Sequence, residues 1–182
     1  MEYLDIVDDN GVPTGEIISR DEAHRKGIMH RTAHVWVIRR SDRGTEVLLQ
    51  KRSLNKESFP GMYDTSSAGH IPAGEEPLTS ALRELKEELG IAAEKNSLEY
   101  IGSFHIKYEK IFHGSLFKDN ELTSVYLYSG AVETENLELQ QSEVESVRWF
   151  DIEEVWQEIQ QNRERFCVPT EGLKILRDHL NM

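Results

Sequence analysis

Residues 69–91 constrain the fold more than any other part of this chain, because they specify one short helix and the loop that enters it. The segment reads GHIPAGEEPLTSALRELKEELGI. Proline is favoured in the first turn of a helix and glycine just after the last, so Pro77 and Gly90 predict a helix over residues 77–89. Its apolar residues fall on one arc and should form the buried face: Leu78, Ala81, Leu82, Leu85 and Leu89.

The same helix carries a row of carboxylates beside its apolar face. Glu84, Glu87 and Glu88 fall along the seam between core and solvent. Arg83 lies one turn before Glu87 and can pair with it. Glutamate, arginine and lysine on a short amphipathic helix most often form an ordinary solvated face, so the row alone does not indicate a functional site.

The wider spacing favours a functional site. It has the form G-x5-E-x7-R-E-U-x-E-E-x-G-U, in which U is an aliphatic residue. Every fixed position is filled, by Gly69, Glu75, Arg83, Glu84, Leu85, Glu87, Glu88, Gly90 and Ile91. A chance match in a chain of this length has a probability on the order of one in ten million. The pattern resembles the signature of the Nudix hydrolases.

This resemblance implies a fold and an activity. The fold would be α/β, a Nudix-type α/β/α sandwich with a mixed β-sheet. The activity would be hydrolysis of a nucleoside diphosphate linked to another moiety, or of a related diphosphate, with Mg²⁺ or Mn²⁺ as cofactor. The expected metal ligands are Glu84, Glu87, Glu88 and the backbone carbonyl of Ala68. Glu75 and Arg83 would brace the loop against the helix, with Gly69 and Gly90 as structural positions.

The chemistry of diphosphate hydrolysis explains why such a cluster of carboxylates is needed. Mg²⁺ prefers oxygen ligands, and it commonly binds a few carboxylates together with substrate phosphate oxygens. A bound cation neutralises the phosphate oxygens and lowers the pKa of the attacking water, whose proton a further carboxylate can accept.

A second resemblance covers most of the chain outside the helix. The stretches DDNGVPTGEI, KRSLNKESFPGMYDTSSAGH and KDNEL are similar to their counterparts in type 1 isopentenyl diphosphate isomerases, which share the Nudix fold. By that resemblance Arg52 and Lys56 would contact the diphosphate, although both residue types are also common on solvated loops. It also implies a possible second metal site, matched here by His24, His30, His70 and Glu121. A histidine of this kind can equally have a structural hydrogen-bonding role.

The departures from the isomerases favour hydrolysis. The isomerases need a catalytic cysteine at the position of Ala68, whose methyl group cannot transfer a proton. They also tend to carry a degenerate signature, whereas the signature of this chain is complete. We therefore expect a pyrophosphohydrolase in which Glu121 or one of the helix glutamates accepts the proton from water. The alternatives are an isomerase-like enzyme and a non-catalytic nucleotide-binding module, which would be expected to lose some of the carboxylates.

Length and charge agree with one small enzyme domain. The 182 residues are expected to form a single Nudix domain, in which residues 1–30 are an N-terminal extension of the core. The net charge of -12 argues against nucleic acid as a partner and leaves a small-molecule diphosphate as the expected one. The acidic N-terminus and the absence of a long apolar run predict no membrane segment and a cytoplasmic location. Cys167 is expected to be structural, and the family resemblance makes a homodimer possible.

Alternation of apolar residues and turn signals predicts the remaining elements. Strands are expected at residues 3–7, 17–18, 34–39, 46–50, 64–70, 98–106, 123–132 and 147–150. Further helices are expected at residues 21–26, 151–160 and 170–180, with Asp151 and Thr170 as caps of the last two. Four aromatic residues could stack on a base but are more often core residues at strand positions: Trp36, Phe59, Tyr63 and Tyr126.

Overall fold

A computed structural model describes residues 2–42 and 44–182, which form two β-sheets and four α-helices. The strands are β1 (Tyr3–Val7), β2 (Pro13–Ser19), β3 (His30–Ser41), β4 (Gly44–Arg52), β5 (Tyr63–Asp64), β6 (Ser67–His70), β7 (Leu98–Phe112), β8 (Ser115–Tyr128) and β9 (Val144–Asp151). The helices are α1 (Arg20–Lys26), α2 (Pro77–Leu89), α3 (Ile152–Gln161) and α4 (Thr170–His179), with short 3-10 turns η1 (Lys95–Ser97) and η2 (Thr134–Asn136).

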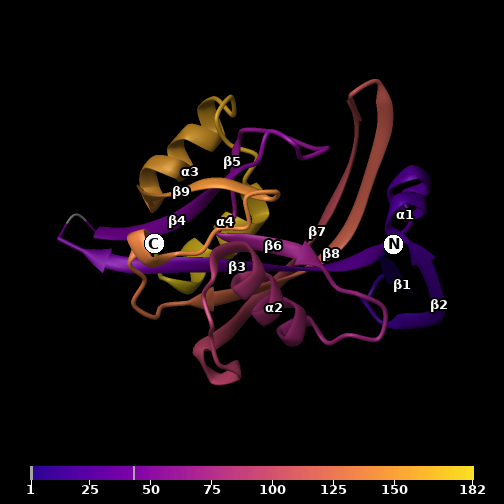
Figure 1. The fold of residues 1–182 in the computed structure, drawn as a ribbon, viewed down its shortest axis with the longest axis horizontal. Helices are drawn as coiled ribbons and strands as arrows, with labels where there is room; N and C mark the ends of the chain where they lie inside the picture. Colours follow the sequence, from indigo (N-terminus) through magenta and orange to yellow (C-terminus); the bar gives the residue numbers. More distant parts are fainter. Residues whose placement is uncertain (1, 43) are drawn as a thin grey trace.

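Helices cover both faces of the larger sheet, so the predicted α/β/α sandwich is confirmed. Alternate residues of β3 belong to two separate cores: Val35 and Val37 pack with Leu85 of α2, whereas Trp36 packs with Leu173 of α4. Figure 1 shows α2 well apart from α3, which belongs to the same core as α4. The sheet is mixed because β3 and β8 run parallel while its other neighbouring strands are antiparallel.

Helix α2 has the predicted bounds. Pro77 occupies its first turn, and Gly90 ends it with φ 73°, in the left-handed region that glycine adopts without strain. Ala81, Leu85 and Leu89 are fully buried. The partly buried Leu78 and Leu82 pack against the same core. The apolar arc read from the sequence is therefore the face that packs on the sheet.

The larger sheet splits where β3 and β4 stop pairing with each other. Their pairing runs from Ser41 and Gly44 to Val37 and Leu48. There the Ser66 hydroxyl accepts a hydrogen bond from the Val37 N–H and donates one to the Leu48 carbonyl. Beyond that point β4 pairs with β5, and β3 pairs with β6. We call this divergence the fork.

The fork explains why one predicted strand became two. Residues 64–70 were expected to form a single strand, but the chain crosses the fork between Asp64 and Ser67. It leaves the edge of β4 and joins the edge of β3, so a continuous ladder is impossible.

Strands β7 and β8 form a much longer hairpin than predicted. They were expected to end at residue 106 and to begin at residue 123, but their pairing continues to Phe112 and Ser115. The hairpin projects away from the body of the sheet (Figure 1). Its outer part, residues 107–120, is here called the arm. Charged residues and the turn residues His113 and Gly114 interrupt the apolar pattern of this segment in the sequence. Ring contacts of Phe117 with Tyr108 and Phe112 on the opposite strand support the hairpin.

The predictions for the C-terminal helices were right in position and partly wrong in capping. The Asp151 side chain accepts hydrogen bonds from the N–H groups of Glu153 and Glu154, as expected of a helix cap. Thr170 was expected to cap α4, but it is the first helical residue and the cap position is Pro169. Within the described residues, no helix is long and apolar enough to cross a membrane.

The N-terminal strand β1 is tied to the loop that precedes α2. One carboxylate oxygen of the buried Asp5 accepts hydrogen bonds from the Arg31 guanidinium at 3.0 Å and from the Gly74 N–H at 2.9 Å. The same Arg31 nitrogen also donates to the Glu75 carbonyl. Since this loop carries Glu75 of the signature, residues that precede the core help to fix its path.

Replacing Asp5 by Ala should therefore destabilise the protein. The substitution leaves the Gly74 N–H without its acceptor and the partly buried Arg31 guanidinium without its anionic partner, at a cost of about 1–3 kcal/mol. Urea unfolding followed by circular dichroism measures this change. Asp9→Ala is the control, because Asp9 is exposed on the turn that follows β1. Equal stability of the two variants would contradict the role given to Asp5.

Candidate active site

The fork opens into a cavity of about 1050 Å³. Its wall takes Thr32 and His34 from β3, Arg52 from β4, Asp64 from β5 and the segment from Ala68 to His70 of β6. Glu121 of β8 and all three glutamates of the α2 row also line it. The cavity thus brings together residues that are far apart in the sequence.

Glu88 is buried at the base of this cavity, only 4% exposed. Its Oε2 atom accepts hydrogen bonds from the Gln50 amide at 3.2 Å and from the Ala68 N–H at 3.1 Å. Burial raises the pKa of this carboxyl to about 7, and the neighbouring charge of Glu84 adds to the rise. The site therefore holds a carboxylate whose negative charge needs a positive partner.

Glu84 lies directly over Gly69. A methyl group added to Gly69 would come within 2.2 Å of the Glu84 carboxyl carbon, so the glycine is what allows the loop and the helix to approach so closely. Burial also raises the pKa of Glu84, opposed by the Arg83 guanidinium at 2.5 Å. The first and the central positions of the signature are thus in direct contact.

Arg83 links the loop to the helix. It donates to Glu75 and to Glu87, each at 3.3 Å, and to the His70 carbonyl at 3.3 Å. The pairing with Glu87 expected from the sequence is present. The Glu87 side chain is 52% exposed, compared with 15% for Glu84, so it lies at the rim of the cavity.

Arg52 and Lys56 line the same cavity, but each already has an anionic partner. Arg52 pairs with Asp64 at 2.9 Å and donates to the carbonyl and hydroxyl of Ser58, which holds the loop of residues 53–62 in place. Lys56 pairs with Glu143. An incoming phosphate would share these two cations with carboxylates.

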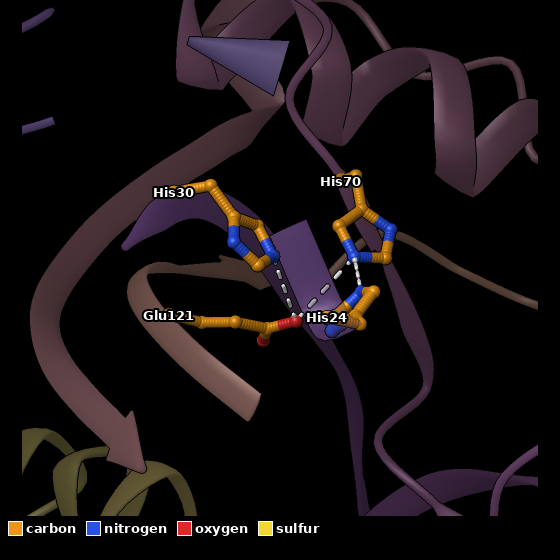
Figure 2. Close-up of side chains that lie close together, drawn as sticks. All are labelled: His24, His30, His70 and Glu121. Carbon is orange, nitrogen blue, oxygen red and sulfur yellow. Dashed lines mark hydrogen bonds and ion pairs between the residues drawn. The ribbon is translucent and has the colours of Figure 1, made fainter. Parts of the chain in front are cut away.

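Three histidines and a glutamate meet beside the signature, as Figure 2 shows. The histidine cluster consists of His24 of α1, His30 of β3, His70 of β6 and Glu121 of β8. Their ligand atoms all lie within 4.8 Å of one another. The parallel pairing of β3 with β8 places His30 opposite Glu121, and α1 supplies His24 from the N-terminal part of the chain.

The tautomer of His30 shows what this cluster lacks. Its Nδ1 atom lies 2.8 Å from the Ile28 carbonyl, which can only accept, so Nδ1 carries a hydrogen. The buried Nε2 atom then has no hydrogen-bond partner, and it faces Glu121 Oε1 at 3.6 Å. Either a proton on Nε2 or a cation bound between Nε2 and Oε1 would make this buried contact favourable. Orientation of a ring by a carbonyl on its other nitrogen is typical of metal-binding histidines.

The electrostatics of the cluster also suit a cation. Burial, with the neighbouring His70 and His30 rings, lowers the pKa of His24 to about 3, so this ring is neutral and offers a lone pair. Burial opposes ionisation of Glu121, but the His30 and His70 rings hold its pKa well below the usual range. Histidine nitrogens around an ionised carboxylate are a common set of ligands for a divalent metal.

Sequence reasoning missed several residues of this site. Asp119 lies 3.6 Å from His24, and burial next to Glu121 raises its pKa to about 9. Its spacing of two from Glu121 in a strand would have placed both carboxylates on one face, had the strand been predicted that far. Gln50, which binds Glu88, and Thr32, which donates to Glu121, carry no signal that single-sequence reasoning could have used.

The four aromatic residues weighed as base-stacking candidates differ in position. Trp36 and Tyr126 are core residues, and Tyr63 packs against the core. Phe59 instead lines the cavity. Cys167 also borders the cavity, where its thiol lies 3.5 Å from the Tyr63 carbonyl and burial raises its pKa well above the usual range, so it is not a ready nucleophile.

Comparison with known proteins agrees with this geometry. The family model of the NUDIX domain matches residues 29–168. An uncharacterized Nudix hydrolase of Clostridium acetobutylicum is 43% identical over 154 residues, which cover 85% of this chain and 72% of that protein. An isopentenyl-diphosphate Delta-isomerase of Rhodobacter capsulatus is 34% identical over 168 residues, covering 91% and 87% of the two chains. A crystal structure of a Deinococcus radiodurans protein superposes with a TM-score of 0.71 at 20% identity, over 97% of this chain and 98% of the other, and supports the fold.

The chain belongs to the Nudix family. Its relatives and its complete signature make it an enzyme of the pyrophosphohydrolase class, which acts on acid anhydrides. Nudix enzymes generally use divalent metal ions and act on small-molecule diphosphates. Both resemblances read from the sequence, to Nudix hydrolases and to the isomerases that share their fold, are confirmed.

Replacing Gly69 by Ala should displace the Glu84 carboxylate from the cavity wall. A displacement of about 1 Å in a catalytic group can lower turnover by about a hundredfold. Turnover and thermal unfolding of the variant, measured side by side, test this expectation. A variant with unchanged turnover would show that the close approach of Gly69 and Glu84 does not matter for activity, and one that fails to fold would show a purely structural role.

Proposed function

We propose that the protein is a metal-dependent hydrolase that cleaves a diphosphate linkage, in a nucleoside diphosphate derivative, by attack of water on phosphorus. One observation carries the proposal: the buried Glu88 and the partly buried Glu84 line one cavity together with Ala68, and the cations Arg52 and Lys56 line the same space. Anionic ligands for a metal thus face cationic residues that can hold phosphate.

The carboxylate site fits Mg²⁺ or Mn²⁺. The charge of Glu84 raises the pKa of Glu88, so a cation between them would relieve the repulsion. Carboxylate oxygens are the ligands that these ions prefer. Glu87, at the exposed rim, and the backbone carbonyl of Ala68 would complete the protein ligands. The cation, when bound, supplies neutralisation of the diphosphate oxygens and lowers the pKa of nearby water.

The chain's own residues then have distinct tasks. Arg52 and Lys56 hold the terminal oxygens of the diphosphate, exchanging part of their pairing with Asp64 and Glu143 for phosphate. Glu88 or Glu121 accepts the proton of the attacking water, since both carboxylates line the cavity. The Gln50 amide and the Ala68 N–H keep Glu88 in one orientation, so little reorganisation is needed during the reaction.

Isomerisation is the second candidate because isomerases are among the relatives. Ala68 argues against it, because this methyl-bearing residue lies in the cavity wall beside Glu88 and has no acidic proton. A non-catalytic binding role is disfavoured by the complete set of signature glutamates.

The histidine cluster is proposed as a second divalent metal site. The unpartnered Nε2 atom of His30 opposite the Glu121 carboxylate supports this assignment. Imidazole donors favour a transition-metal ion such as Mn²⁺ over Mg²⁺. His70 belongs to this site and adjoins Gly69 of the signature, so the two metal sites would lie side by side in one cavity.

Replacing Glu88 by Gln removes one ligand charge and one possible base while keeping the shape of the side chain. Turnover should fall by a factor of about a thousand or more, with the fold retained. The assay uses nucleoside diphosphates and triphosphates, nucleotide sugars, dinucleoside polyphosphates and isopentenyl diphosphate, each with Mg²⁺ and with Mn²⁺, and identifies products by mass.

Glu94→Gln is the matched control, because Glu94 is exposed and its side chain makes no capping hydrogen bond. Near-normal turnover of Glu88→Gln would reject the metal-ligand role of Glu88. Isomerised isopentenyl diphosphate without hydrolysis of any compound would reject the hydrolase itself.

Replacing His30 by Ala should empty the histidine cluster of metal. Elemental analysis of the purified protein after dialysis against Mn²⁺ measures the bound ion directly, without reliance on turnover. His113→Ala serves as control, since His113 is exposed in the turn of the long hairpin. If both variants retain as much metal as the unmodified protein, the cluster is a hydrogen-bonded group and not a metal site.

A further inference from the structure

Aromatic rings form a continuous wall that leads outward from the histidine cluster. Phe117 of the arm stacks on His24, with ring centroids 4.3 Å apart and planes at 20°. Its other neighbours are Tyr108 at 6.3 Å and Phe112 at 5.8 Å, both on the opposite strand of the hairpin. Phe59, in the loop of residues 53–62, closes the series at 5.0 Å from Phe112. We call Phe59, Tyr108, Phe112 and Phe117 the aromatic wall.

The aromatic wall does not belong to the protein core. None of its four members is found in the three buried clusters of the described residues. Phe59, Tyr108 and Phe117 instead line the cavity. Aromatic side chains gathered on a projecting hairpin, outside any core, leave apolar surface next to water, which stabilises a fold little and suits ligand binding.

The conformation of Phe59 points the same way. Its φ of 49° is in the left-handed region, which non-glycine residues seldom adopt. Such strain persists only where the surrounding structure enforces it, and it is concentrated at functional sites. Here Arg52 holds Ser58, the residue before Phe59, through both backbone and side chain, and the Phe59 carbonyl accepts a hydrogen bond from the Met62 N–H.

Lys110 covers the outer end of the wall. Its ammonium nitrogen lies 4.5 Å from the ring centre of Phe59 and 5.4 Å from that of Phe112. Among the described residues it has no carboxylate within ion-pair distance, and it is exposed. A cation held only by ring faces at an exposed site is displaced at little cost, so the wall is accessible to a ligand.

The cavity has room for more than a diphosphate. At about 1050 Å³ it lies at the upper end of the range for small-molecule sites, far larger than the phosphate groups alone would fill. The cations and metal ligands occupy one side of this space, and the aromatic wall occupies the arm side. A substrate that spans both sides has a diphosphate at one end and an apolar face at the other.

We propose that the aromatic wall is the specificity subsite for a flat ring system attached to the diphosphate, with Phe59 as its main contact. The inference rests on the proposed diphosphate chemistry and deepens it, since it names the residues that read the organic group. Flat rings gain most from aromatic faces, and a stacked base loses roughly tenfold to a hundredfold in affinity when its partner ring is removed. Displacement of Lys110 by the incoming ring opens the subsite.

Binding of non-hydrolysable diphosphonates tests the proposal without relying on turnover. The three probes, in Mg²⁺, are methylenediphosphonate, adenosine 5′-(α,β-methylene)diphosphate and a geranyl diphosphonate, measured by calorimetry. Phe59→Leu and Phe117→Leu keep apolar volume but remove the ring. Both variants should bind the adenosine probe roughly tenfold to a hundredfold more weakly than the unmodified protein does. Their affinity for methylenediphosphonate should be unchanged. Ile111→Ala is the control, because Ile111 is 68% exposed on the face of the hairpin opposite Lys110 and Phe112.

Three outcomes would overturn the proposal. The unmodified protein could bind the adenosine probe no more tightly than methylenediphosphonate. The two Leu variants could lose affinity for the adenosine probe and for methylenediphosphonate to the same extent, which would mean that the rings only shape the cavity. The geranyl probe could bind most tightly and keep its affinity in the two Leu variants, which would mean that the wall receives an aliphatic chain. If the Leu variants selectively lose binding of the adenosine probe and the unmodified protein hydrolyses no substrate, the role of the wall as a subsite is supported and the proposed hydrolysis is rejected.

Discussion

The site depends on the hydrogen bonds of one serine hydroxyl at the point where β3 and β4 separate. Two neighbouring strands can part only if the backbone groups they leave behind find other partners, and Ser66 supplies these to Val37 and Leu48. The strands β5 and β6 then pair with the separated edges. The cavity lies in the resulting gap in the sheet, so strands supply one part of its wall and the loop of residues 53–62 supplies another.

Helix α2 completes the site because its packing holds two carboxylates in a position where ionisation is unfavourable. Its apolar arc fixes the helix on the sheet, and that position forces Glu88 into the interior and Glu84 against Gly69. Burying these carboxylates is unfavourable, as their raised pKa values show. Arg83, Gln50 and the Ala68 N–H offset part of this cost, and a bound cation would offset the rest. The buried carboxylates therefore lower the stability of the fold at the position where a metal site needs negative charge.

The accuracy of the sequence predictions followed the range of the interactions involved. The bounds of α2 and its buried arc were correct, because proline, glycine and the helical period act within a few residues. The split between β5 and β6 and the extent of the long hairpin were missed. Both depend on partners distant in the sequence: Ser66 acts on two other strands, and Phe117 is supported by Tyr108 and Phe112 across the hairpin.

By itself the sequence determined the family, the helix and the identity of its metal-binding candidates. The signature is a local pattern within residues 69–91, and the spacing of its glutamates follows the period of the α-helix. Only the tertiary structure decided which of these groups share a space. It brought together the His24, His30, His70 and Glu121 side chains that the resemblance had grouped, and it gave Arg52 and Lys56 anionic partners. It also placed Phe59 and two rings of the arm, Tyr108 and Phe117, in the wall of the same cavity. The physical reason is that strand pairing is non-local: a register between β3 and β8, more than eighty residues apart in the chain, is set by packing that no short stretch of residues encodes.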